Sequence, residues 1–355
     1  MKRDHTCVRL RRKPFLLALL LTTLCGASQT PFARASEITV GSPVGGTRIS
    51  SPILIRAHNI GCAGIRPTSF GYSLDDDPAM VPAGTPFDVD VMGQDLAPGT
   101  HTVHFKSWTS KGACPVVSTT FTVADPEEPV KGPSIPGNAI SSGDLDGSND
   151  WVEGHDARTP GEAVGVTVYP ATTPLYDDAR EFSMTYSDRA GERWSNSFAR
   201  DTESTYFALD VYVFIPNPSQ ILNLEMDINQ VAKNGNTIIM STQCSGTHGV
   251  WEYGDTVDDV DHWLLTKMPC NPAEWAPNAW HHIQIGEHHD GKGVVTHDWV
   301  TLDGVYTPFV GATHESAHPE GWEIGDVNTQ FQIEGPSETS ATASIYVHNM
   351  TVYRW

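Results

Sequence analysis

Residues 221–230 have the sequence ILNLEMDINQ, in which apolar and polar side chains alternate. In a β-strand this alternation places Asn223, Glu225, Asp227 and Asn229 on one face and four apolar side chains on the other. Glu225 and Asp227 are then about 6.6 Å apart along the strand, so that each carboxyl affects the pKa of the other. Such paired carboxyls suit acid–base and nucleophilic chemistry.

The letters of this strand resemble the concanavalin A-like lectin/glucanase superfamily, whose laminarinases, lichenases and cellobiohydrolases carry Glu-x-Asp-x-x-Glu on a cleft strand. The resemblance implies that Glu225 is the nucleophile and Asp227 its helper. Gln230 takes the position of the family's acid/base glutamate, or a bulge shifts Asn229 into it. A retaining glycosidase needs a second carboxyl to protonate the leaving oxygen, and an amide has no such proton to give.

Two further segments support the same fold. The sequences WHHIQI at 280–285 and VTLDGVY at 300–306 resemble laminin-G-like and related concanavalin-type domains. Strand-like runs recur between residues 163 and 353 without a helical repeat, which indicates an antiparallel sandwich. We therefore predict a concanavalin A-like jelly-roll domain over residues 141–355.

Aromatic residues follow the polar strand and suit sugar binding, because the apolar face of a pyranose stacks on a flat ring. Trp251 and Tyr253 alternate, and Trp263 comes soon after them. A disulfide between Cys244 and Cys270 would restrain the loop that carries these rings. The predicted substrate-binding residues are Asn223, Asn229, Gln230, Trp251, Tyr253 and Trp263.

Residues 36–124 contain six or seven short β-rich runs separated by turn residues, which predicts a β-sandwich. The stretches SPVGGTRISSPILIRA and APGTHTVHFKSW resemble the bacterial immunoglobulin-like domains that are often attached to secreted carbohydrate-active proteins. We expect an immunoglobulin-like sandwich here, acting as a spacer or accessory module. The Pro-rich segment 125–140 is expected to be a linker.

Residues 1–35 have the pattern of a secretory signal peptide, with six basic residues before an apolar run and the sequence Ala-Arg-Ala at 33–35. No later run has the roughly 20 apolar residues of a membrane helix, so we expect an exported chain without a membrane span, either extracellular or periplasmic. Four cysteines remain after processing, and the expected disulfides are Cys62 with Cys114 and Cys244 with Cys270.

Removal of residues 1–35 leaves 15 Lys and Arg against 42 Asp and Glu, a formal net charge of −27. Nucleic acid and polyanionic sugars are disfavoured by this charge. The expected partner is a neutral, β-linked polysaccharide, and the protein is expected to be a monomer.

No cofactor is required by these residues, although Asp144, Asp146 and Asp150 form an acidic loop that resembles a calcium-binding turn. The candidates for a catalytic acid in place of the family's glutamate are the acidic stretch 255–261 and seven histidines. These histidines are His281, His282, His288, His289, His297, His314 and His318. A uronate lyase using Gln230, a histidine and a tyrosine is a further alternative, which the net charge disfavours.

Three functions follow from these observations. The first is a secreted carbohydrate-binding protein that holds a neutral polysaccharide in a jelly-roll cleft. The second is a retaining, endo-glucanase-like glycoside hydrolase with an altered acid/base group. The third is a surface adhesion or structural module without a sugar site.

Overall fold

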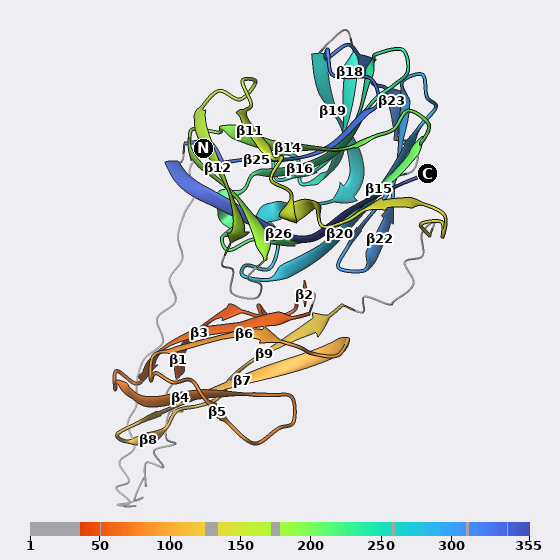
Figure 1. Ribbon diagram of the computed structural model, residues 1–355. Coiled ribbons are helices and arrows are strands. Elements are labelled where there is room, and N and C mark those ends of the chain that lie inside the picture. Colours follow the sequence, from red (N-terminus) through yellow and green to blue (C-terminus); the bar gives the residue numbers. More distant parts are fainter. Residues whose placement is uncertain are drawn as a thin grey trace, which may run out of the picture. The chain divides into compact units, whose positions relative to one another are not determined.

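The computed structural model describes residues 36–49, 51–124, 134–171, 178–257, 260–309, 312–338 and 340–355. These residues form an all-β protein (Figure 1). Helical structure in these ranges is limited to three short 3-10 turns: η1 (Leu145–Gly147), η2 (Pro218–Gln220) and η3 (Pro272–Glu274). The expected signal peptide and most of the expected linker lie outside the described residues. Within them, no helix has the length and apolar character needed to cross a membrane.

The first sandwich is built from two sheets of residues 36–123. The three-stranded sheet has the order β1 (Ser36–Ser42), β3 (Ile53–Cys62), β6 (Asp88–Gln94). The other sheet has the order β2 (Arg48–Ile49), β9 (Val117–Val123), β7 (Gly99–Thr109), β4 (Pro67–Leu74), β5 (Val81–Pro82), with β8 (Gly112–Ala113) beside β7. Phe70, Phe105 and Phe121 are buried in the core of this sandwich.

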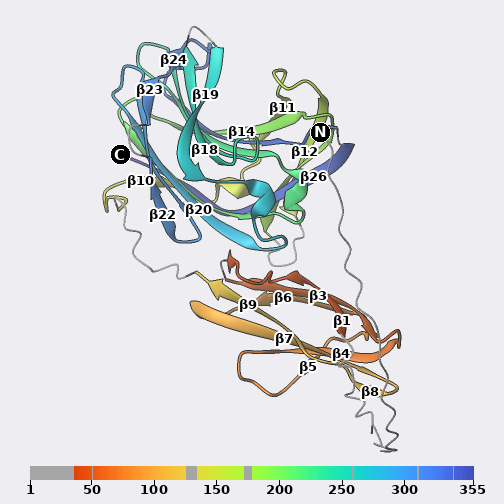
Figure 2. The ribbon, with the colours of Figure 1, turned by 180° about the vertical axis from the view of Figure 1, so that it is seen from behind.

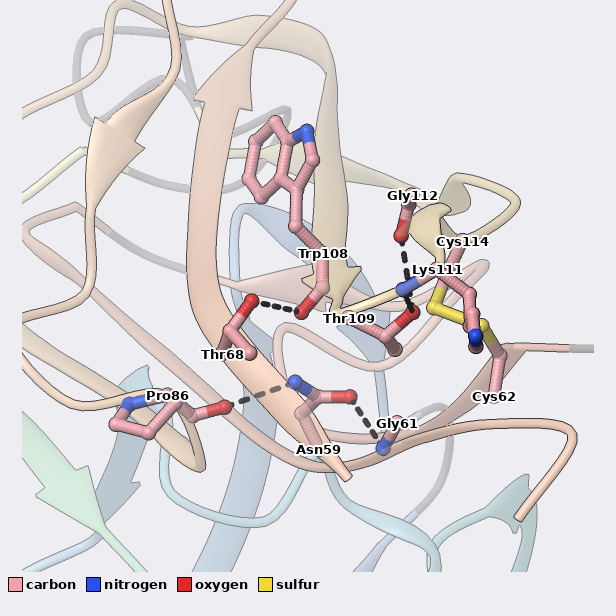
Figure 3. Close-up of a disulfide and its surroundings, with 10 residues drawn as sticks. All are labelled: Asn59, Gly61, Cys62, Thr68, Pro86, Trp108, Thr109, Lys111, Gly112 and Cys114. Atoms are coloured by element: carbon pink, nitrogen blue, oxygen red, sulfur yellow. Dashed lines mark hydrogen bonds between the residues drawn. A yellow bond between two sulfur atoms is a disulfide. The ribbon is translucent and has the colours of Figure 1, made fainter. Parts of the chain in front are cut away.

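A disulfide joins the two sheets of the first sandwich, because Cys62 ends β3 and Cys114 follows β8. Figure 3 shows the bond beside the buried Asn59, whose amide donates to the carbonyl of Pro86 over 2.9 Å and accepts from the backbone N–H of Gly61 over 2.9 Å. Gly61 has a φ of +105°, a conformation that other residues rarely adopt. The local chain thus presents Cys62 in a fixed position, and the expected pairing with Cys114 is confirmed.

The second sandwich, seen from both sides in Figures 1 and 2, consists of two larger sheets. The nine-stranded sheet has the order β12 (Glu162–Ala171), β13 (Ala179–Ser187), β26 (Ser340–Arg354), β15 (Tyr206–Phe214), β20 (Trp280–His289), β21 (Val294–Leu302), β22 (Val305–Pro308), with β10 (Ile140–Ser142) beside β26 and β23 (Thr313–Glu315) beside β21. The eight-stranded sheet has the order β11 (Val152–His155), β14 (Gly191–Arg200), β25 (Asp326–Glu334), β16 (Asn223–Val231), β17 (Thr237–Ser245), β18 (Val250–Val257), β19 (Val260–Pro269), with β24 (Ala317–His318) beside β17.

The space between these two sheets is a continuous apolar core. Phe182, Trp194 and Phe331 are buried there. The ring centroid of Phe182 lies 5.1 Å from that of Trp194 and 5.8 Å from that of Phe331. The second expected disulfide, Cys244 with Cys270, is also present at this core. The fold class expected from the sequence, an all-β chain with two β-sandwiches, is confirmed.

Candidate functional site

Strand β16 is the central polar strand of the eight-stranded sheet, and it pairs without interruption with β17 and β25. Glu225 lies opposite Gln243 on β17 and Gln332 on β25, and Asp227 lies opposite Ser241 and Gln330. Neither pairing contains a register shift, so the strand has no bulge. The period of two therefore holds, and Glu225, Asp227 and Asn229 share one face.

That face forms the floor of a groove made of two adjoining pockets of about 200 and 280 Å³. Arg158, Glu225 and Trp263 line both pockets, so the two are continuous at Glu225. The first pocket also includes Asp227 and Asn229. Together the two pockets provide room for a ligand longer than a single small group.

The two carboxyls on the floor lie in unusual electrostatic surroundings. Glu225 is 5% exposed and Asp227 3% exposed, and the protonation of each carboxyl depends on the other. Burial raises the pKa of Glu225 well above its usual value, and the charge of Asp227 raises it further. Burial also raises the pKa of Asp227 to about 7. Near neutral pH, this pair therefore retains a proton.

Several oxygen atoms of the groove residues are buried without a hydrogen-bond donor among the described residues. They are Asp227 Oδ1, Asn229 Oδ1, Asp255 Oδ1 and Gln332 Oε1. The two amide orientations follow from their other bonds, because Asn229 Nδ2 donates to Asn328 Oδ1 over 3.0 Å and Gln332 Nε2 donates to Asp156 Oδ2 over 3.2 Å. Buried acceptors without donors are costly, so a ligand with several O–H or N–H groups would satisfy them.

Two indole rings contribute to the groove. Trp263 on β19 lines both pockets, as expected for a sugar-stacking residue, and Trp322 lines the first pocket with 39% of its surface exposed. Trp322 lies in the segment before β25, and the sequence analysis missed it. A lone tryptophan in the polar segment PEGWEIGD was the available signal.

The structure corrects the expected positions of Trp251 and Tyr253. Trp251 is 3% exposed in the core, 6.3 Å from Phe309 between ring centroids, and Tyr253 packs partly buried against the same core. The alternation along β18 explains this, because Glu252 lies opposite Gln243 on the groove side, which turns the two aromatic neighbours of Glu252 toward the core.

Gln230 also lies elsewhere than the resemblance implies. Its amide donates to the backbone carbonyls of Asp201 and Ser204 over 3.1 Å each, and it lines neither pocket. Asn223, another predicted binding residue, also lines neither pocket, and its Nδ2 donates to Oε2 of Glu334, which lines the second, over 2.9 Å. The residue that follows Asp227 on the groove face is Asn229, so β16 supplies two carboxyls to the floor.

Other charged residues in the groove come from neighbouring strands and loops, and the sequence analysis did not single them out. Arg158 Nε lies 3.2 Å from Asp156 Oδ1, and Arg189 Nε lies 3.4 Å from Glu334 Oε2. Arg193 lies on β14 opposite Gln332 and lines the first pocket. The recurrence of Asn328, Gln330 and Gln332 at every second position of β25 was a signal for a second polar strand.

The seven histidines that were considered as substitute acids line neither pocket, whereas His262 and Asp255 line the first. Four of the seven are paired with carboxylates at 2.7 Å: His281 with Asp303, His282 with Asp210, His288 with Asp298 and His297 with Glu287. His318 lies 3.4 Å from Glu320.

The acidic loop with Asp144, Asp146 and Asp150 is held by an arginine. The carbonyls of Asp146 and Ser148 accept hydrogen bonds from Arg180, and Asp146 Oδ1 accepts from the backbone N–H of Met350 over 2.9 Å. Among the described residues, no group of three or more His, Cys, Asp or Glu side chains is arranged to hold a metal ion. Calcium binding by this loop stays a prediction.

No family model matches the chain. No curated protein matches it either. Among solved structures, it is similar to a lectin from Bauhinia forficata, with 10% identity, a TM-score of 0.34, and coverage of 61% of this chain and 98% of the lectin. A Bacillus licheniformis β-glucanase gives 10% identity, a TM-score of 0.33, and 61% and 98% coverage. A structure of carbohydrate-binding modules from the β-sandwich superfamily gives 12% identity, a TM-score of 0.31, and 90% and 97% coverage. At this level of likeness, the comparisons assign no function to the groove.

Proposed function

We propose that this protein binds a polysaccharide in the groove above β16, with a neutral, β-linked chain as the first candidate ligand. The observation that carries this proposal is the set of buried oxygen acceptors without donors in a groove that also contains Trp263 and Trp322. Sugar hydroxyls supply donors, and the apolar faces of sugar rings stack on indoles. We also propose membership of the concanavalin A-like superfamily, and export of the chain, which its two disulfides support.

Each groove residue has a definite role in this proposal. Asp227, Asn229 and Gln332 accept hydrogen bonds from the sugar through the oxygens that have no donor in the described structure. Trp263 lies at the junction of the two pockets, where a stacked ring would be held next to Glu225. Because Trp251 and Tyr253 belong to the core, substitution at these positions tests the fold rather than the binding site.

The test is a binding measurement on the secreted protein with soluble β-glucan, xylan and mannan oligosaccharides. We expect Trp263→Ala and Trp322→Ala each to weaken binding of the preferred chain about three- to tenfold. Leu265→Ala is the matched control, since Leu265 lies on the same strand as Trp263, is 55% exposed and lines neither pocket. Absence of binding to every chain would contradict the proposal and favour an adhesion or structural module.

One observation favours a second candidate, a glycoside hydrolase. Besides Glu225 and Asp227, four carboxyl residues line the two pockets: Asp156, Asp255, Glu320 and Glu334. A glycosidase needs a second carboxyl, about 5 to 10 Å from the first, as its acid/base group. In this candidate, one of these four residues supplies it. Release of oligosaccharides by the wild type, lost in Glu225→Gln, would establish this candidate, and retention without release would exclude it.

A further inference from the structure

The charges that line the groove are not balanced. Three arginines contribute to the two pockets: Arg158, Arg189 and Arg193. Six carboxyl residues contribute as well: Asp156, Glu225, Asp227, Asp255, Glu320 and Glu334. Two of the arginines form ion pairs with two of the carboxylates: Arg158 with Asp156 and Arg189 with Glu334. The first pocket is lined by four of these carboxyls, Glu225, Asp227, Asp255 and Glu320, and by two guanidiniums, Arg158 and Arg193. With one proton shared by Glu225 and Asp227, acidic groups remain in excess.

Two acceptors lie next to each other on the floor of this pocket. Asp227 Oδ2 already receives a hydrogen bond of 2.9 Å from Gln330 Nε2, which leaves Asp227 Oδ1 without a donor. Asn229, two residues further on the same face, directs its Nδ2 to Asn328 and so leaves its Oδ1 without a donor. Both side chains are only 3% exposed. A buried carboxyl oxygen and a buried amide oxygen, both without donors, thus belong to neighbouring residues of the groove face that both line the first pocket.

We infer that the sugar residue held over Asp227 and Asn229 carries a protonated amino group. This inference rests on the proposed function and narrows the ligand from a neutral chain to one that contains amino sugars. An ammonium group has three N–H donors and a positive charge, so it can donate to both oxygens and offset the excess of carboxyls. A hydroxyl at the same place has one donor and no charge. The negative field of the protein also attracts a cationic chain.

Three β-linked hexamers that differ in one substituent test this inference. They are the hexamers of glucosamine, of N-acetylglucosamine and of glucose, which carry an ammonium, an acetamide and a hydroxyl group on the second ring carbon. At about pH 7 and low ionic strength, where Asp227 is ionised in part of the molecules, we expect the glucosamine hexamer to bind at least about tenfold more tightly than the glucose hexamer. Added salt should weaken binding of the glucosamine hexamer selectively.

Two variants locate the effect. Asp227→Asn keeps the shape of the side chain and removes its charge, so we expect the glucosamine and glucose hexamers to bind it with nearly equal affinity. Glu323→Gln removes one negative charge outside both pockets, where Glu323 pairs with Arg200, and should preserve the preference. Thermal unfolding of both variants verifies that they are folded.

The outcomes separate the two proposals. Equal or tighter binding of the glucose hexamer by the wild type would overturn the amino-sugar inference and leave the sugar-binding groove intact. A preference for glucosamine that persists in Asp227→Asn would also overturn it, because the cation would then be held elsewhere. Failure of all three hexamers and of the neutral polysaccharides to bind would contradict the proposed function itself.

Discussion

Gln330 Nε2 donates a hydrogen bond to Asp227 Oδ2 across 2.9 Å, from one strand of the groove floor to the next. The bond favours the ionised form of a carboxyl whose pKa burial raises to about 7. Gln330 is therefore one of the groups that favour the charged form of Asp227, beside Ser241 and Arg158, which also lower its pKa.

Removal of that donor should shift the pH dependence of binding. In Gln330→Met, we expect the pKa of Asp227 to rise by about one unit. The reason is that a hydrogen bond to a charged group contributes about 1.5 to 3 kcal/mol to the stability of a folded protein. Titration of oligosaccharide affinity against pH would show the midpoint moved upward by that amount. An unchanged midpoint would indicate that Asp227 does not govern binding.

Glu225→Gln should make the protein more stable at high pH. The folded pKa of Glu225 is raised, so its contribution to stability is fully present below the unfolded pKa and is lost as pH rises through the folded value. The variant avoids this loss. We expect its Tm to exceed that of the wild type at about pH 8, by roughly 2 to 4 °C per kcal/mol recovered, and to match it near pH 4. An equal Tm at both pH values would contradict the assignment.

His314 should make the protein sensitive to acid. Burial lowers its pKa to about 4, and both ring nitrogens lack a partner among the described residues. For a base with a lowered pKa, stability is present above the unfolded value of about 6.5 and is lost as pH falls toward the folded value. In His314→Gln, we expect Tm relative to the wild type to rise as pH falls from about 7 to about 4.5. Parallel Tm curves would show that His314 does not titrate in this window.

The disulfide between Cys244 and Cys270 should stabilise the second sandwich. It spans 26 residues, for which loop entropy gives about 3 to 4 kcal/mol. The double variant Cys244→Ala/Cys270→Ala should lose that much in denaturant unfolding, whereas surface substitutions such as Leu265→Ala should change the free energy of unfolding by less than about 0.5 kcal/mol. A loss of similar size in both variants would contradict the prediction.

Much of the groove floor was predictable because strand alternation is a local property. The letters of β16 correctly place Glu225, Asp227 and Asn229 on one face, since each position follows from its neighbours. Trp251 was misplaced for a different reason. Period two divides β18 into two faces, but which face meets the core depends on pairing with β17, a contact between residues that the local sequence does not specify.

Long-range contacts also decide the remaining differences. The side chain of Gln230 donates hydrogen bonds to the backbone carbonyls of Asp201 and Ser204. In the acidic loop, the carbonyl of Asp146 accepts a hydrogen bond from Arg180, 34 positions away in the sequence. Arg158 and Trp322 reach the groove from segments outside its central strands. Such placements require the topology of the sheet, so composition and spacing alone did not reveal them.

The unbroken register of β16 makes residue 229 a position at which the acidity of the groove floor can be changed by one substitution. Because no bulge intervenes, the side chain of residue 229 points at the same space as those of residues 225 and 227. A single base change converts an asparagine codon into an aspartate codon, so one point mutation, Asn229→Asp, would add a third carboxyl to the floor. This one substitution would leave the pairing of β16 with β17 and β25 in register.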